Sequence, residues 1–261
     1  MEEEQLLKSG ERINQLFSTD IKIIQNREVF SYSVDSVLLS RFPRFPKKGL
    51  IVDFCAGNGA VGLFASTRTQ AQILSVEIQE RLADMAERSV RLNGLEEQMQ
   101  VICDDLKNMP AHIQGSKVDM ILCNPPYFKV NMILCNPPYF KVNPYSNLNE
   151  SEHYLLARHE ITTNLEEICR SAQSILKSNG RLAMVHRPDR LLDILDTLKR
   201  HNLAPKRLQF VYPKREKEAN MLLIEAIKDG STSGFKVLPP LIVHNDDGSY
   251  TPEIEEIYYG S

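Results

Sequence analysis

The sequence predicts an α/β fold: a mostly parallel sheet with helices on both faces and an antiparallel hairpin near its C-terminal end. Three observations predict it. Short apolar runs typical of buried strands alternate with segments of helical periodicity. A glycine-rich turn follows the first core run. Two extended runs near residue 215 have no helix between them, which favours antiparallel pairing.

The first half of the core is expected to contain four strands and a helix. Gly49–Ala56 is a short apolar run that ends in small residues, as a buried parallel strand does. Apolar residues recur at helical spacing from Arg81 onward, and Asn93-Gly94 is a helix stop signal. The strands are expected at 49–56, 72–78, 100–103 and 118–123, and the helix at 81–93.

The second half continues the same alternation. Leu165, Ile168 and Ala172 form the apolar stripe of a helix, which Asn179-Gly180 is expected to stop. The charged segment Lys214–Glu218 separates the last two extended runs. The expected elements are a helix at 163–177, a strand at 181–186, a helix at 190–201, and strands at 208–212 and 220–227.

One core domain is expected over residues 49–228. Residues 1–48 are interpreted as an N-terminal extension packed on this core. Residues 229–261, rich in Pro, Asp and Glu towards their end, are interpreted as an extended C-terminal strap. No long linker is visible, and 261 residues with 42% hydrophobic content suffice for a substantial core.

Composition argues against membrane and disulfide-rich classes. No apolar run approaches the length that spans a bilayer, and the acidic start Met1–Gln5 does not resemble a signal peptide. The five cysteines are an odd number and lack the spacing of metal ligands. We therefore expect reduced thiols, no bound metal and a cytoplasmic location.

Charge is unevenly distributed along the chain. The formal net charge is −3, yet Lys177–Lys217 holds eleven Lys or Arg against four Asp or Glu. Such an excess permits binding to a phosphate backbone, although a solvated basic face is the simpler interpretation of charge alone.

Twelve residues occur twice in succession, at Met120–Asn131 and Met132–Asn143. Each copy contains Asn-Pro-Pro-Tyr, in which an amide and a proline-bounded carbonyl can accept both protons of an amino group. One repeated unit is not a solenoid, which needs several. One active site needs one copy, so the repeat raises the question of which copy is used.

The glycine turn has the sequence Asp53-Phe-Cys-Ala-Gly57-Asn-Gly59-Ala-Val-Gly62. Its glycines let the backbone turn sharply and let a ligand approach closely. The spacing alone is a weak signal, and a tight strand-to-helix turn is the simpler interpretation.

Acids at three successive strand ends are more specific. Glu77 follows Asp53 by 24 residues, where a carboxylate can accept hydrogen bonds from ribose hydroxyls. Asp105 could accept a proton from an adenine amino group, and Asp53 could lie beside an ammonium. A nucleoside with an amino-acid tail would use all three, although each acid alone could merely cap a helix.

This pattern resembles the class I S-adenosylmethionine-dependent methyltransferases, with their Rossmann-like fold, over about Gly49–Gly180. The resemblance implies S-adenosyl-L-methionine as the cofactor. A nicotinamide dehydrogenase would leave Asp105 and the Asn-Pro-Pro-Tyr unexplained. The cofactor-binding residues implied are Asp53, Ala56, Gly57, Asn58, Gly59, Glu77 and Asp105, with Asp35 as a weaker assignment.

The tetrapeptide Asn124-Pro125-Pro126-Tyr127 would then be catalytic. Asn124 Oδ1 and the Pro125 carbonyl would accept the protons of an exocyclic amine and turn its lone pair towards the methyl group. Tyr127 would stack on the substrate plane. Adenine N6, cytosine N4, guanine N2 and a glutamine amide are all possible substrates at this point.

Further segments resemble the bacterial tRNA methyltransferases that modify N6 of adenosine 37 in valine tRNA. These segments are Phe30–Leu39, Ala157–Ile161, Met184–Pro188, Phe210–Lys214 and Glu218–Met221. The resemblance implies tRNA as the partner, with a candidate contact at Lys206, Arg207, Lys214, Arg215 and Lys217. Glutamine-modifying relatives carry a separate helical N-terminal domain, for which the short segment before the first core strand leaves no room.

The first copy of the repeat keeps its expected distance in sequence from the strands before it. The second copy keeps its expected distance from the segment that follows the repeat. The loops on either side must close, and this would decide which copy pairs as the strand. We favour the first copy, with Asn136, Pro137, Pro138 and Tyr139 of the second as the alternative. Another amino-group methyltransferase, or a donor-binding protein impaired by the duplication, are the competing functions.

Overall fold

The computed structural model describes residues 3–16, 18–29, 32–113, 117–125 and 164–260. The strands are β1 (Glu11–Leu16), β2 (Ile21–Asn26), β3 (Leu50–Phe54), β4 (Gln72–Glu77), β5 (Met99–Cys103), β6 (Val118–Cys123), β7 (Leu176–His186), β8 (Leu203–Tyr212), β9 (Met221–Lys228), β10 (Lys236–Val237) and β11 (Leu241–Ile242). The helices are η1 (Glu3–Leu6), α1 (Val34–Leu39), α2 (Ala60–Ser66), α3 (Glu80–Leu92), η2 (Leu106–Asn108), α4 (Met109–His112), α6 (Leu165–Ile175), η3 (Pro188–Arg190), α7 (Leu191–Arg200) and α8 (Pro252–Tyr259).

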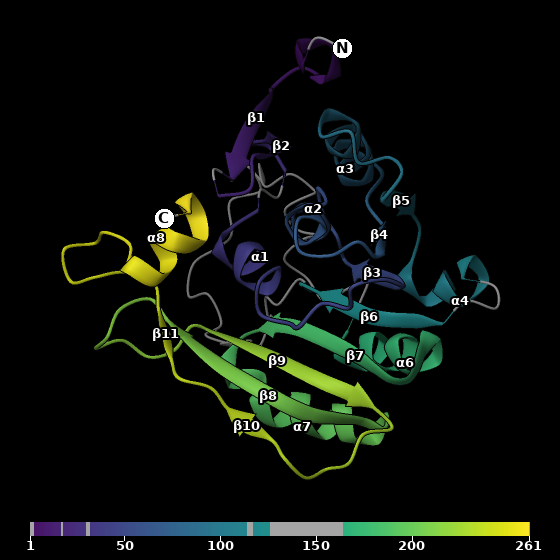
Figure 1. Ribbon diagram of the computed structural model, residues 1–261, viewed down its shortest axis with the longest axis vertical. Helices are drawn as coiled ribbons and strands as arrows, with labels where there is room; N and C mark the ends of the chain where they lie inside the picture. The colour runs from purple at the N-terminus through teal and green to yellow at the C-terminus, as the bar shows by residue number, and fades with distance from the viewer. Residues whose placement is uncertain (1–2, 17, 30–31, 114–116, 126–163, 261) are drawn as a thin grey trace, which may run out of the picture.

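The central sheet of the described residues has nine strands, in the order β10-β8-β9-β7-β6-β3-β4-β5 with β11 also beside β8 (Figure 1). Strands β5, β4, β3, β6 and β7 are parallel. Strand β9 is antiparallel to both β7 and β8. The predicted mostly parallel sheet and its antiparallel C-terminal hairpin are therefore confirmed.

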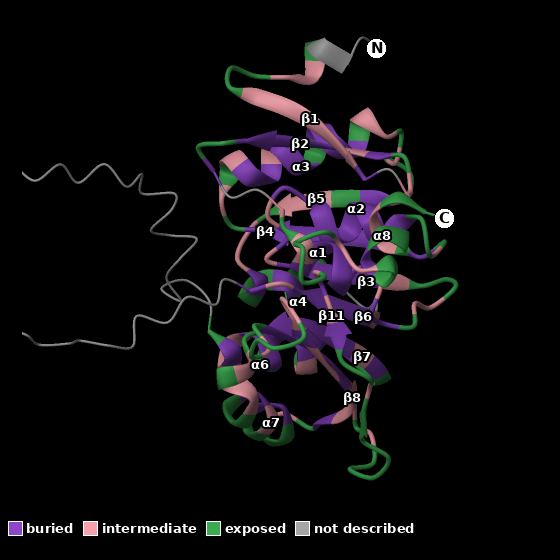
Figure 2. Cartoon of the chain, turned by 90° about the vertical axis from the view of Figure 1, so that its left-hand side faces the viewer, coloured by how far each residue is buried: buried purple, intermediate pink, exposed green. Residues whose placement is uncertain are grey.

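Helices cover both faces of this sheet. Neighbouring strand residues point to opposite faces, so Ile51 and Met120 join the cluster under α1 and α2, whereas Val52 and Ile121 join the cluster under α6 and α7. Figure 2 shows the buried residues concentrated along the sheet and on the helix sides that face it. The near-continuous apolar runs in the sequence follow from this burial on both faces.

The register of the parallel strands brings their carboxyl ends to one edge. Phe54 at the end of β3 pairs with Val76 of β4 and with Cys123 of β6. Glu77 at the end of β4 pairs with Cys103 of β5. The segments that follow these strands therefore meet at the same edge, where ligands bind in open α/β sheets.

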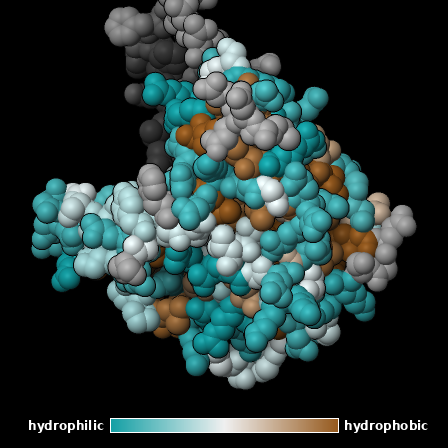
Figure 3. All heavy atoms as spheres, turned by 45° about the horizontal axis from the view of Figure 1, so that its top comes forward, coloured by the Kyte–Doolittle hydropathy of each residue, from teal (hydrophilic) through white to brown (hydrophobic). Residues whose placement is uncertain are grey.

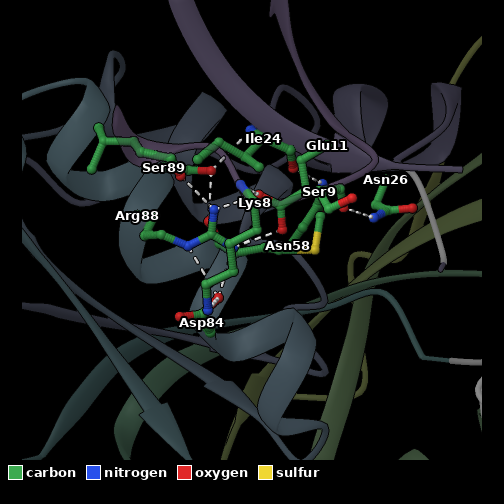
Figure 4. A network of polar contacts seen from close by, with 11 residues as sticks. Lys8, Ser9, Glu11, Ile24, Asn26, Asn58, Asp84, Arg88 and Ser89 are labelled. Carbon is green, nitrogen blue, oxygen red and sulfur yellow. Dashed lines mark hydrogen bonds and ion pairs between the residues drawn. The ribbon is translucent and has the colours of Figure 1, made fainter. Parts of the chain in front are cut away.

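The N-terminal extension contains a hairpin, β1–β2, that sequence periodicity does not predict. Arg88 of α3 holds it, because its guanidinium donates to both carboxylate oxygens of Glu11, at 2.5 and 2.8 Å (Figure 4). Ser89 Oγ accepts the backbone N–H of Ile24 at 3.0 Å. The carbonyl of Ile24 accepts from Asn58 Nδ2 at 3.0 Å, which ties β2 to the glycine turn.

Several elements differ from the sequence expectations at their ends. The strand expected at 181–186 begins earlier, at Leu176, directly after α6. A register shift between Val118 and Met120 accommodates this early pairing with β6. The C-terminal strap is extended where β10 and β11 pair with β8, but it also contains the helix α8, which was not expected.

None of the helices that the structure describes is long and apolar enough to cross a membrane. The molecular face shown in Figure 3 is mostly hydrophilic, and its apolar residues gather in separate patches.

Candidate active site

The glycine turn after β3 runs through unusual backbone conformations. Cys55 and Gly57 have φ values of +56° and +58°, and Gly59, the N-cap of α2, has a φ of +85°. A Cβ at Gly59 would lie 3.1 Å from Cβ of Ala86. The left-handed conformation and the nearby helix α3 together explain why glycine occupies position 59.

Glu77 at the end of β4 is fixed by this turn. Its Oε2 accepts the backbone N–H of Gly57 at 2.8 Å, and its Oε1 accepts that of Gln79 at 2.9 Å. Burial raises the pKa of Glu77, although these backbone hydrogen bonds oppose the shift. The carboxylate lines a cavity of about 1060 Å³ and retains lone pairs for a ligand.

Asp53 lies beneath the turn. It is fully buried and does not line the cavity, and its Oδ2 accepts the N–H of Gly62 at 3.0 Å. Its Oδ1 has no hydrogen-bond partner. Burial, assisted by the charge of Glu77, raises the pKa of Asp53 to about 8. Its predicted contact with a ligand's ammonium stays a prediction.

Two adjacent acids follow β5. Asp105, the predicted one, lines the cavity, accepts the N–H of Lys107 at 2.9 Å and pairs with its ammonium at 2.9 Å. Asp104 also lines the cavity, a position that sequence reasoning missed. The hydrogen bond from His112, with those from Asn108 and the Asp105 N–H, lowers the pKa of Asp104 to about 2.

The first copy of the repeat supplies strand β6 from Met120 onward. Its Asn124 and Pro125 lie at the carboxyl end of β6 and line the cavity. Asn124 Nδ2 donates to Ser36 Oγ at 3.1 Å. Pro126, Tyr127 and the second-copy residues Asn136, Pro137, Pro138 and Tyr139 lie outside the described residues.

Another side of the cavity is closed by Ser33, the N-cap of helix α1, and by Val34, Asp35 and Ser36 of the helix. Asp35 is 7% exposed, and its Oδ1 accepts from Ser33 Oγ at 2.5 Å and from the Ser36 N–H at 2.8 Å. The weakly assigned Asp35 thus lies at the cavity wall together with two serines that were not predicted.

A further wall comes from the strands beyond β6. Arg187, Pro188 and Asp189 follow β7, whereas Glu218, Ala219 and Asn220 precede β9 and Met221 is its first residue. Sequence reasoning did not assign these residues to the site, although its matching segments Met184–Pro188 and Glu218–Met221 include most of them.

Of the predicted cofactor residues, Asp35, Ala56, Gly57, Asn58, Glu77 and Asp105 line the cavity, whereas Asp53 and Gly59 do not. Ile78 also lines it and, at 43% exposure, offers an apolar surface. Across the described ranges, no group of three His, Cys, Asp or Glu side chains could hold a metal ion.

The basic stretch, the residues between Lys206 and Lys217 that are predicted to contact tRNA, is partly engaged in contacts within the chain. Lys206 Nζ donates to the backbone carbonyls of Ser231 and Ser233. The Arg207 guanidinium lies over the Phe42 ring, 4.7 Å from its centroid. Arg215 and Lys217 are exposed, and they immediately precede the cavity residues Glu218–Met221.

Comparison with known proteins gives one consistent result. Residues 20–129 match the family model of the methyltransferase small domain. A curated tRNA1(Val) (adenine(37)-N6)-methyltransferase from Porphyromonas gingivalis is 27% identical over 228 residues, covering 84% of this chain and 83% of its own. A protein of the same name from Photobacterium profundum is 23% identical, covering 85% of this chain and 86% of its own.

Solved structures share the fold. A predicted O-methyltransferase from Agrobacterium tumefaciens superposes with a TM-score of 0.64 at 21% identity, covering 87% of this chain and 96% of its own. A geranyl diphosphate C-methyltransferase from Streptomyces coelicolor, solved with S-adenosyl-L-homocysteine, has a TM-score of 0.51 at 12% identity, covering 73% of this chain and 76% of its own.

Proposed function

We propose that this chain, which belongs to the class I S-adenosylmethionine-dependent methyltransferases, methylates N6 of adenine in tRNA, at position 37 of valine tRNA. One observation carries the proposal. Asn124 and Pro125 line the same cavity as Glu77 and Asp105, so the proposed amine acceptors and the proposed nucleoside-binding acids share one space. The curated relatives that match most of the chain carry the name of this reaction.

The described residues fit the methyl donor. Glu77 offers a fixed carboxylate to ribose hydroxyls, and Asp105 offers acceptor oxygens near the end of β5. Ile78 and Leu106 offer apolar surface to a purine ring. When bound, S-adenosylmethionine supplies a methyl group that its sulfonium has already activated.

The residues of the chain orient the acceptor rather than activate it. In this proposal, Asn124 Oδ1 and the Pro125 carbonyl accept the two protons of an exocyclic amine, which directs the nitrogen lone pair to the donor side. The Pro125 ring fixes its own φ, which restricts the backbone that carries its carbonyl. The nitrogen gains the methyl group and then releases one proton to solvent, so no strong general base is needed.

We assign the acceptor position to the first copy of the repeat, because its strand is β6 and its Asn124 lines the cavity. We further propose that Arg215 and Lys217 contact tRNA phosphates, since they are exposed and adjoin the cavity residues Glu218–Met221. The proposal places the reaction in the cytoplasm, where tRNA is found.

Incubation with methyl-labelled S-adenosylmethionine and total tRNA, followed by digestion to nucleosides, tests the function. We expect the label in N6-methyladenosine, and we expect its loss when a valine tRNA transcript carries guanosine at position 37. Label in guanosine, in cytidine or only in protein would show a different amino-group methyltransferase. Donor binding without any transfer would show a binding protein impaired by the duplication.

A further inference from the structure

Ser36 of helix α1 contacts the side chain of Asn124 across 88 residues of sequence. Its Oγ accepts a hydrogen bond from Asn124 Nδ2 at 3.1 Å. Ser36 is 3% exposed and lines the cavity, as does Asn124. The two residues thus meet at the wall of the site, one from the N-terminal extension and one from the end of β6.

In this contact, Ser36 Oγ accepts from the donor end of the Asn124 amide. An asparagine side chain has a donor end, Nδ2, and an acceptor end, Oδ1, which are nearly equal in size. Because Ser36 Oγ accepts from Nδ2, Oδ1 takes no part in this contact and stays available as an acceptor. An exocyclic amine must donate its protons, so it can use only the acceptor end. In the opposite orientation, the amide would present N–H groups to an amine that also carries N–H groups.

Ser36 is itself held in place. Its backbone N–H donates to Asp35 Oδ1 at 2.8 Å, and the same oxygen accepts from Ser33 Oγ at 2.5 Å. Five of the six residues of α1, from Asp35 to Leu39, are buried. The hydroxyl that meets Asn124 therefore sits on a packed element, which is what precise orientation of a catalytic group requires.

We propose that Ser36 is a positioning residue for methyl transfer, which holds the Asn124 amide with its oxygen available to the acceptor amine. The inference rests on the proposed function in one respect, namely that Asn124 receives an amino group. It adds that the N-terminal extension completes the catalytic geometry, although Glu77 lies at the end of β4 and Asp105 follows β5.

Kinetics of two Ser36 variants test the proposal. Ser36→Ala should lower kcat about three- to tenfold, which is the effect expected from the loss of one neutral hydrogen bond. The dissociation constant of S-adenosylhomocysteine should stay unchanged. Ser36→Thr keeps the hydroxyl and should restore kcat to within about twofold of the native protein. Ser40→Ala is the matched control, because Ser40 is equally buried but its Oγ donates to the Val37 carbonyl and does not line the cavity.

A double-mutant cycle separates positioning from packing. In an Asn124→Ala background, Ser36→Ala should cause no further loss in single-turnover rate, because its effect acts through Asn124. An equal loss in both backgrounds, or an unchanged kcat in Ser36→Ala, would overturn the proposal.

Nuclear magnetic resonance provides a readout that does not depend on activity. The side-chain amide signals of Asn124 are those missing from the spectrum of ¹⁵N-labelled Asn124→Ala. Ser36→Ala should shift them and speed their exchange with water, whereas Ser40→Ala should leave them in place. Unchanged Asn124 signals in Ser36→Ala would refute the contact, whichever substrate the enzyme proves to use. A wild-type protein that fails to methylate tRNA would refute only the proposed function.

Discussion

Gly57 donates its backbone N–H to Oε2 of Glu77 at 2.8 Å, which joins the glycine turn after β3 to the end of β4. The two features that the sequence suggested separately are therefore one unit. The turn fixes the carboxylate, and the carboxylate satisfies a backbone donor of the turn.

Glu77→Gln should weaken binding of S-adenosylhomocysteine about 10- to 100-fold, because a charged acceptor of ribose hydroxyls becomes neutral. A glutamine amide has only one oxygen, so it can accept from the N–H of Gly57 or of Gln79 but not from both. Its NH₂ group would face the other N–H, which is also a donor. Isothermal titration calorimetry measures the change. Glu80→Gln removes the same charge from an exposed position outside the cavity and is the control. Similar losses in both variants would argue against a specific role for Glu77.

The duplicated segment is tested by paired variants. Asn124→Ala should lower kcat about 100-fold or more with little change in donor affinity, since it removes an acceptor aligned with the reacting amine. Asn136→Ala should leave activity close to native. Deletion of residues 132–143 should likewise retain activity. If Asn136→Ala abolishes transfer and Asn124→Ala does not, the assignment of the first copy is wrong.

The sequence predicted the elements whose signals are local. The helix expected at 81–93 is α3 at Glu80–Leu92, and Gly94, with a φ of +63°, follows its end as the Asn93-Gly94 signal indicated. The acids Glu77 and Asp105 line the cavity because parallel strands place their ends at one edge. Helix α8 also has a local signal, Pro252 at its first position.

Two of the features that were missed depend on distant contacts. The β1–β2 hairpin is anchored by Arg88 and Ser89, more than 60 residues away. Nothing near Ser36 in the sequence indicates a contact with Asn124. Asp104 and Asp105 are neighbours in the sequence, and both line the cavity, although we assigned only the second.

Asp53 should make stability depend on pH. Its pKa is raised to about 8 in the folded chain, from an ordinary value of 3.8, chiefly by burial. The protonated form is therefore favoured on folding. This contribution is fully present below about pH 4 and is lost as the pH rises through about 8.

Asp53→Asn should remove this dependence, because the neutral amide can still accept the Gly62 N–H. Urea unfolding at pH 5 to 9 measures the free energies of unfolding of the variant and of the native protein. Their difference should shift in favour of the variant as the pH rises and become constant above pH 8. Asp196→Asn, at a side chain 70% exposed, is the control and should give a constant difference. A constant difference for Asp53→Asn as well would contradict the raised pKa.

The ion pair between Arg88 and Glu11 should stabilise the fold. Their side chains are only 9% and 3% exposed, so Arg88→Ala leaves the Glu11 carboxylate buried without its partner. Such a loss costs about 3–5 kcal/mol. Arg91→Ala in the same helix removes an exposed pair with Glu87 and should cost less than about 1 kcal/mol. Urea unfolding measures both, and equal effects would show that the buried pair contributes little.

The basic stretch should divide into residues that bind tRNA and residues that hold the fold. Arg215→Gln and Lys217→Gln should each weaken tRNA binding and reduce the slope of log affinity against log salt by about one, because one phosphate contact is lost. Lys206→Gln should change this slope less, because the Lys206 ammonium already contacts the carbonyls of Ser231 and Ser233. Filter binding at several salt concentrations measures the slopes. A smaller change for Arg215→Gln than for Lys206→Gln would place the tRNA surface elsewhere on the protein.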